Sequence, residues 1–596
     1  MSQGAPVTPR RSAREYMTIL ESPPQPASAN GRTTAVVGGL AAALVGGGAM
    51  LLLRSGLQVR SIPERLMEWI LLFVPPGIFE WGLQVLGFEA KRYTLYLAIL
   101  VVLGLWAWLG YDALRRRWPV RTIGVLGIGI WLAVMLVVMP LTSAGIFALD
   151  LRDGSAAAIG GYLAVGLSYA AVLALFRMRN VQPERHEESR RIALGLLGGA
   201  VVSSLATYLA VRLLPHQAGL PTVVLEDPQQ PVPSGGIDPP NPHPSLVEAA
   251  GAPAPAPIAT DAPSVGSLPE PTTTRVLKRD NAGAIVPAGR VRGQLTRPIT
   301  ANEDFYVVTK NAGGDPELRP SDWRLQVDGE VSRAFQLDYA TLRKLPSVEV
   351  TRTLECISNF VGKPELAPFG AELISTAVWK GVAVRDVLAL VGGPSPGAAW
   401  VVVFGADEYT SALPLDVMMD PATLLVYEMN GEVLPHEHGY PVRLLVPDRY
   451  GMKNPKWLVG LRVMKREFND WYGQRNWSKT AIVQTMSRID SPAPDTMLAP
   501  GTHTVAGIAF AGSRGISAVE YSVDDGKIWQ RATLSTSGAG VDHWFAWQGN
   551  FDVAAGSDAR IVARATDGAG VVQTEAFGLP EPDGGTGWPR IGVRAS

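Results

Sequence analysis

The stretch Val-Thr-Arg-Thr-Leu-Glu-Cys-Ile-Ser-Asn-Phe at residues 350–360 contains Cys356, the single cysteine of the 596-residue chain. Its first half is typical of a β-strand. A lone thiol cannot form a disulfide within one chain, so Cys356 serves in packing, in reactivity or in metal ligation. A thiolate is well suited to a soft metal centre.

The densest polar stretch of the chain lies at residues 435–457 and reads Pro-His-Glu-His-Gly-Tyr-Pro-Val-Arg-Leu-Leu-Val-Pro-Asp-Arg-Tyr-Gly-Met-Lys-Asn-Pro-Lys-Trp. Its His, Arg and Lys side chains suit a polyanionic cofactor, because guanidinium and ammonium groups form strong charge-assisted bonds to phosphate. The alternative is an ordinary solvated loop in which these cations face water. The net charge of −1 argues against a nucleic-acid binder, which needs a basic face.

Together these stretches resemble the sulfite oxidase family of molybdenum enzymes. A third match, Asn-Glu-Asp-Phe-Tyr-Val-Val-Thr-Lys-Asn at 302–311, lies upstream, and the three occur in the family's order within residues 285–596. The resemblance implies the molybdenum–molybdopterin cofactor, with the Cys356 thiolate bound to the metal as its catalytic ligand and the pterin dithiolene supplying further sulfurs. It also implies the cofactor-binding residues, which are Asn302, Phe305, Tyr306, Asp407, His438, Arg443, Asn454 and Lys456.

The sequence departs from the sulfite-oxidising pattern at one place. Where those enzymes carry two arginines that help to bind the sulfite anion, this chain has Phe360 and Val361. The departure favours a small S-oxide or N-oxide substrate over sulfite, with Arg449 as a substitute cation by loop position only.

The first 214 residues are strongly apolar and contain five runs long enough to cross a bilayer, which takes about 20 helical residues. A sixth stretch, 64–88, carries charges and prolines and is expected to be interfacial or re-entrant. The five predicted spans are 33–53, 93–114, 121–147, 156–178 and 192–214.

Arginine placement sets the predicted topology, because cytoplasmic loops are enriched in Lys and Arg. Arginines crowd the N-terminal tail and the 115–121 and 177–191 loops. Five crossings put all three segments inside, whereas six would leave some outside. We therefore expect a multi-pass protein of the bacterial cell membrane with its catalytic half on the outer face. Arg54, Arg60 and Arg65 fit this topology poorly.

The five spans contain no histidine, and paired histidines are the usual axial ligands of a membrane haem. No haem is therefore predicted, and the membrane part is expected to be an anchor or a docking platform for an unknown electron-transfer partner. A quinone site stays open. A transporter is disfavoured because the spans carry almost no buried charge.

Outside the membrane the sequence predicts a disordered tail at 1–32 and a Pro/Ala-rich linker at 215–285. An α+β molybdopterin domain is expected at 286–480 and an immunoglobulin-like sandwich at 481–596. The resembled family uses such a sandwich to form homodimers, although a spacer or binding module would show the same strands. The predicted elements are a hairpin at 323–331, helices at 337–345 and 379–391, a strand at 400–404, and sandwich strands at 502–511, 517–523, 544–547 and 559–565.

Two further hypotheses concern the chain as a whole. Ser189-Arg190-Arg191 immediately precedes the fifth span, as in a twin-arginine export signal, although both arginines could be simple positive-inside anchors. The rival to a molybdopterin oxidoreductase is a non-enzymatic surface protein with a degenerate cofactor domain.

Overall fold

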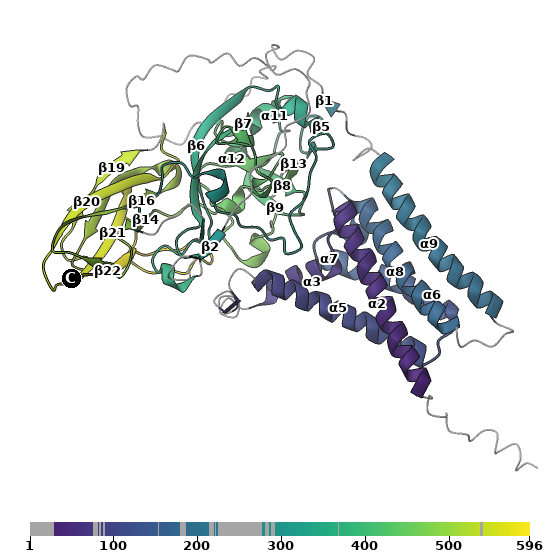
Figure 1. Ribbon diagram of the computed structural model, residues 1–596. Coiled ribbons are helices and arrows are strands. Elements are labelled where there is room, and N and C mark those ends of the chain that lie inside the picture. The colour runs from purple at the N-terminus through teal and green to yellow at the C-terminus, as the bar shows by residue number, and fades with distance from the viewer. Residues whose placement is uncertain are drawn as a thin grey trace, which may run out of the picture. The chain divides into compact units, whose positions relative to one another are not determined.

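The chain folds into two compact units. The first comprises Met1–Arg65, Tyr96–Ala148 and Gly154–Leu213, and the second comprises Leu66–Leu95, Leu149–Asp153 and Leu214–Ser596 (Figure 1). Residues 1–28 of the tail predicted at 1–32 and most of the predicted linker lie outside the described residues, and the last four residues of the predicted tail belong to a helix that begins at Ala29. The computed structural model describes residues 29–74, 82, 85–86, 90–152, 154–178, 186–213, 220, 222–223, 277–279, 285–287, 293–367, 369–536 and 540–595.

Long apolar helices dominate the first unit. The described residues include five helices that are long and apolar enough to cross a membrane, as predicted, although the third ends at Leu141 rather than at 147. The stretch from 64 begins in a short amphipathic helix, α3 (Ile62–Ile70), and much of 75–89 is not described. The long helices are α2 (Ala29–Leu57), α5 (Ala90–Arg115), α6 (Val120–Ala133) with its extension to Leu141, α8 (Ser155–Met178) and α9 (His186–Leu213).

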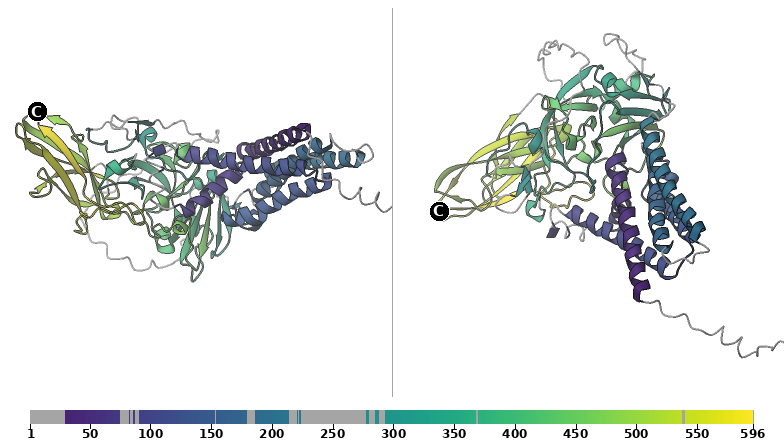
Figure 2. Two further views of the ribbon diagram at one scale, coloured as in Figure 1. Left: turned by 90° about the horizontal axis from the view of Figure 1, so that it is seen from below. Right: turned by 45° about the vertical axis from the view of Figure 1, so that its right-hand side comes forward.

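Helix α8 packs against α2, α6 and α9, and the helices run side by side in Figure 2. At the α6–α8 contact two glycines face each other. A Cβ on Gly127 would lie 2.6 Å from the carbonyl oxygen of Gly166, and a Cβ on Gly166 would lie 2.4 Å from that of Gly127. Small residues let helix backbones approach closely, and this approach leaves no room for a side chain.

The second unit contains two sheets that share the region from 324 to 464. The six-stranded sheet has the order β1-β5-β4-β13-β8-β9, and the five-stranded sheet has the order β11-β10-β7-β6 with β12 paired to β10. Buried side chains from both sheets form one core. The strands are β1 (Thr222–Val223), β4 (Arg324–Gly329), β5 (Phe335–Asp338), β6 (Ser347–Glu355), β7 (Ile374–Ala383), β8 (Trp400–Gly405), β9 (Thr410–Pro414), β10 (Leu424–Met429), β11 (Glu432–Val433), β12 (Arg443–Leu445) and β13 (Leu458–Met464).

The predicted hairpin at 323–331 and the strand at 400–404 are confirmed by β4, β5 and β8. The helix predicted at 379–391 is wrong in its first half, because residues up to Ala383 belong to β7 and the helix α11 is Val384–Ala389. Trp379 and Val382 are fully buried on the sheet, so tertiary burial outweighs the apparent helical period. The helix predicted from 337 is only α10 (Tyr339–Leu342), which Asp338 caps as expected.

Two further sheets form the C-terminal part. One has the order β14-β16-β20-β19 and the other β15-β22-β21-β17-β18, and they share one apolar core. The four predicted strands are confirmed by β16, β17, β20 and β21. The strands are β14 (Met486–Ser491), β15 (Met497–Leu498), β16 (Gly501–Phe510), β17 (Ile516–Ser522), β18 (Gln530–Arg531), β19 (Thr533–Thr536), β20 (Phe545–Val553), β21 (Ala559–Asp567) and β22 (Arg590–Ala595).

Asp542 and Trp544, which precede β20, bond to β6, the strand that leads to the single cysteine. The Thr353 amide donates to the Asp542 carbonyl (3.0 Å), and the Trp544 amide donates to the Thr353 hydroxyl (2.8 Å). The buried Arg352 guanidinium pairs with the Asp542 carboxylate at 2.6 Å. Because a buried ion pair fixes both partners in place, the C-terminal part helps to position this strand.

The Gly127–Gly166 contact gives a first prediction. Gly127→Val should destabilise the helical unit by about 1–3 kcal/mol, because the new side chain must push two backbones apart. Gly129→Val is the matched control, since a Cβ there meets nothing within 4 Å. The measurement is the thermal midpoint of each full-length variant in detergent. Equal midpoints for the two variants would contradict the close helix contact.

Candidate active site

Cys356 follows β6 directly and is held by the neighbouring chain. Glu355, the last residue of β6, lies opposite Ile374 of β7. The Cys356 amide donates to the Leu373 carbonyl (2.9 Å), and the Asn359 amide donates to the Cys356 carbonyl (3.0 Å). The residue is 5% exposed, and burial raises the pKa of its thiol. The sulfur is thus fixed at a strand end.

Four tyrosines lie within electrostatic reach of the Cys356 thiol: Tyr306 and Tyr450, which are buried, and Tyr409 and Tyr472, which are partly buried. Burial raises the pKa of each phenol. All four hydroxyls therefore stay protonated at neutral pH, and the Tyr450 hydroxyl accepts from the Gln484 amide (3.0 Å). The Tyr409 hydroxyl donates to the Met452 carbonyl (2.5 Å).

The predicted 302–311 motif packs against the 435–457 stretch. The ring of Phe305 lies edge-on to the ring of His438, with centroids 5.2 Å apart. His438 Nε2 bonds to the Asn302 carbonyl (3.1 Å), and the Asn302 side-chain amide donates to the Met429 carbonyl (3.3 Å). Tyr306 stacks on Phe305 with centroids 5.5 Å apart. Asn302, Phe305 and Tyr306 are therefore brought together with His438, which lies 136 positions after Asn302 in the sequence.

Of the cations predicted to clamp a phosphate, Arg443 is buried and Lys456 is partly buried. Arg443, on β12, donates to the carbonyls of His438 and Asn454, both at 3.1 Å. Its Nε is buried and has no hydrogen-bond partner among the described residues. Burial lowers the pKa of Arg443 to about 10 and that of Lys456 to about 8. Lys456 donates to the Glu437 carbonyl (2.8 Å).

Glycine is required at the turn of this clamp. Gly439 has φ +116°, and a Cβ on it would lie 3.0 Å from the Cβ atoms of both Arg443 and Lys456. The turn thus brings the two cationic side chains to the same place. Asn454 supports the turn, since its side chain accepts from the Val446 amide (2.6 Å) and donates to the Tyr450 carbonyl (3.0 Å).

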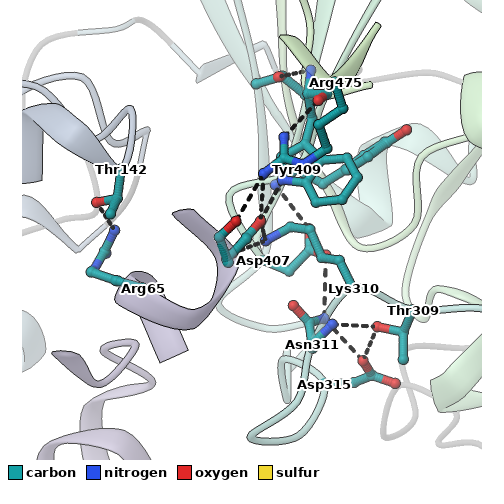
Figure 3. A network of polar contacts seen from close by, with 12 residues as sticks. Arg65, Thr142, Thr309, Lys310, Asn311, Asp315, Asp407, Tyr409 and Arg475 are labelled. Carbon is teal, nitrogen blue, oxygen red and sulfur yellow. Dashed lines mark hydrogen bonds and ion pairs between the residues drawn. The ribbon is translucent and has the colours of Figure 1, made fainter. Parts of the chain in front are cut away.

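Asp407 links the first motif to the tyrosines. Its carboxylate accepts from the Asn311 side chain (3.2 Å) and from the Tyr409 amide (3.1 Å). Asn311 also donates to Asp315 (2.9 Å). Figure 3 shows these residues in one polar network, together with Lys310 and Arg475.

The positions that depart from the sulfite pattern are apolar here. Val361 belongs to a buried cluster with Ile357 and Tyr450, and Phe360 is partly buried. Arg449, the substitute cation considered above, donates to the carbonyl and carboxylate oxygens of its neighbour Asp448 at 3.0 and 3.3 Å.

Several residues beside the site were missed from the sequence. The ring centroid of Trp471 lies 4.9 Å from that of Tyr472 and 5.9 Å from that of Tyr409. The guanidinium carbon of Arg475 lies 3.5 Å from the Trp471 ring centroid. The motif match ended at Trp457, so the local composition Trp-Tyr-Gly-Gln-Arg at 471–475 was the only available signal.

Comparisons with known proteins identify two domains in this chain. A family model described as the oxidoreductase molybdopterin binding domain matches residues 312–472, and one described as the Mo-co oxidoreductase dimerisation domain matches residues 479–579. The chain is 33% identical over 363 residues to a sulfite oxidase of Gallus gallus, covering 54% of this chain and 78% of that protein.

Two other similarities are more limited. The chain is 31% identical over 315 residues to the mitochondrial sulfite oxidase of Homo sapiens, covering 46% of this chain and 57% of that protein. The sulfane dehydrogenase SoxCD from Paracoccus pantotrophus aligns with 25% identity and a TM-score of 0.42, over 47% of this chain and 75% of that one. The sequence matches and the domain matches together show that this chain belongs to the sulfite oxidase family of molybdopterin-dependent oxidoreductases.

Proposed function

We propose that this oxidoreductase is anchored in the bacterial cell membrane and that Cys356 ligates its molybdenum. In this proposal the enzyme catalyses a two-electron oxo transfer on an S-oxide or N-oxide rather than on sulfite. The observation that carries the proposal is the buried Cys356 at the end of β6, whose amide and carbonyl are both held by hydrogen bonds, beside four tyrosines.

The residues present fit the molybdenum–molybdopterin cofactor. Arg443 Nε is buried without a hydrogen-bond partner among the described residues, and a phosphate oxygen is the acceptor that such a donor needs. Asn302, Phe305, Tyr306 and His438 would hold the pterin. Asp407, Arg443, Asn454 and Lys456 would complete its binding site. When bound, the cofactor supplies a metal that cycles between oxidation states two electrons apart and exchanges an oxo group.

The chain's own residues perform three tasks. Cys356 would hold the metal at a fixed point, and the Arg443 and Lys456 cations would retain the cofactor. Tyr472 presents a neutral phenol, which can donate a hydrogen bond to a neutral oxygen of a substrate, and Tyr409, whose hydroxyl is bonded to the Met452 carbonyl, packs beside it.

The substrate proposal rests on charge. Val361 is packed in an apolar cluster, and Arg449 is engaged by the adjacent Asp448. An anion therefore meets less positive charge here than in a site with two additional arginines, and burying an anion without cations is costly. A neutral S-oxide or N-oxide needs only a hydrogen-bond donor.

The unit assignment supports the proposed topology. Leu66–Leu95 and Leu149–Asp153 belong to the unit that contains the catalytic domain. In a five-span topology these two connections lie on the same side as the C-terminal half, which is the outer side by the positive-inside rule. Two separate segments therefore agree with the arginine pattern. We further propose that the C-terminal sheets form an immunoglobulin-like dimerisation domain and that electrons pass to or from a separate protein.

The role of Cys356 gives the main test. Cys356→Ser should lower turnover at least about a hundredfold, because loss of an outer-shell partner alone costs about 10–100-fold and a hard oxygen replaces a soft sulfur. The visible absorption of the metal site should change as well, while the thermal midpoint stays near that of the parent. Full turnover in the serine variant would refute the assignment.

The clamp should control cofactor retention rather than chemistry. Arg443→Ala should reduce pterin content to a small fraction of the parent value, since the phosphate loses a charge-assisted pair. Arg462→Ala is the control, because Arg462 is half exposed and pairs with Asp328 at a surface hairpin. Pterin is measured by its fluorescence after acid release. Stoichiometric pterin in Arg443→Ala would count against the clamp.

Export of the folded domain tests the twin-arginine hypothesis. Arg190→Lys with Arg191→Lys preserves charge, so insertion of the helices should persist while the cofactor-loaded domain no longer reaches the outer face. Arg116→Lys with Arg117→Lys is the matched control in another arginine-rich loop. Protease accessibility in spheroplasts reports the location of the domain. A loaded outer domain in the first double variant would show that the pair is only an anchor.

A further inference from the structure

A carboxylate from the segment between the first two long helices reaches the catalytic domain. Glu68 lies on α3, in the part of the chain that belongs to the second unit. Its side chain is 11% exposed and forms an ion pair with Lys310 Nζ at 3.2 Å. Trp471 donates its indole N–H to the same carboxylate, and Arg475 Nη2 lies 4.0 Å from it. Two cations and one indole therefore converge on one acidic group.

The partners of Glu68 border the active site. Trp471 packs against Tyr409 and Tyr472, and both phenols lie within electrostatic reach of Cys356. Lys310 precedes Asn311, which donates to Asp407. Lys310 and Arg475, which we call the rim cations, thus lie beside residues that neighbour the thiol, and Figure 3 shows both cations with Asp407 and Tyr409.

Charge balance gives Glu68 its significance. Lys310 has a side chain only 6% exposed, so its positive charge is poorly screened by water and needs an opposite charge. Without the carboxylate, the rim cations would attract an anion to the edge of the site, as cationic clefts do. With it, the Lys310 charge is balanced by a direct ion pair, and the Arg475 charge, 4.0 Å from the same carboxylate, is offset in part.

We infer that Glu68 is a specificity-determining residue that keeps the rim cations from recruiting anionic substrates. The inference rests on the proposed function, because it explains how a site with nearby cations selects a neutral S-oxide or N-oxide. The competing role is a purely structural pin that holds α3 on the catalytic domain. A pin would affect stability without altering the affinity for anions.

Sulfate is the probe, because it is a tetrahedral dianion whose sulfur is fully oxidised. Its affinity for the cofactor-loaded full-length chain is measured by calorimetry in detergent. Glu68→Gln should bind sulfate at least about tenfold more tightly than the parent. Without the Glu68 carboxylate, Lys310 and Arg475 can form charge-assisted hydrogen bonds to the sulfate oxygens instead. Glu68→Asp should keep the weak affinity of the parent. Glu68→Gln with Lys310→Gln should lose the gain.

Glu330→Gln is the matched control, because Glu330 is a more exposed carboxylate of the same unit that pairs with Lys465 at 3.3 Å. Equal sulfate affinity in the parent and Glu68→Gln would overturn the inference, as would an equal gain in Glu330→Gln. A changed thermal midpoint without a changed affinity would establish the pin instead. If the parent reduces no S-oxide or N-oxide, the proposed substrate class fails, whereas the sulfate affinities still decide the role of Glu68.

Discussion

The buried cations of the 435–457 stretch are the constraint on which the site depends. Lys453 is balanced by the carboxylate of Asp470 at 2.5 Å. Arg443 and Lys456 instead donate to backbone carbonyls, which carry only partial charge, while the carboxylates of Asp315 and Asp407 attract Lys456 without a direct ion pair among the described residues. A buried positive charge without a full counter-charge is costly. The chain accepts this cost where a polyanionic cofactor would supply the missing charge, and this explains why burial lowers the pKa of both groups.

The rest of the second unit places the sulfur beside that charge. Strand β6 ends at Glu355, opposite Ile374 of β7, and this register fixes the position of Cys356, the next residue. Asp542 and Trp544 hold the same strand from the C-terminal part. The cysteine and the clamp come from elements far apart in sequence, so a sheet and its loops are needed to set their separation. Loss of either would leave a cofactor without a fixed metal or a thiol without a cofactor.

Sequence patterns predicted this site unevenly, for physical reasons. Cys356 and Arg443 could be located because each motif carries its chemistry within a few neighbouring residues. The contacts of Tyr409, Trp471 and Glu68 could not, because they form only when distant segments fold together. Trp379 shows the same limit for secondary structure, since its run fits a helix by period, and burial between strands decides otherwise. The five apolar helices were predictable because the bilayer length requirement acts on each segment alone.

The central claim is that Cys356 binds molybdenum held by a pterin dithiolene. X-ray absorption at the molybdenum edge of the purified full-length enzyme tests it most directly, because it counts the sulfur atoms bound to the metal. The account predicts three sulfur ligands in the parent, one from Cys356 and two from the dithiolene, and two in Cys356→Ser. Two sulfur ligands in the parent, or the same number in both proteins, would contradict it.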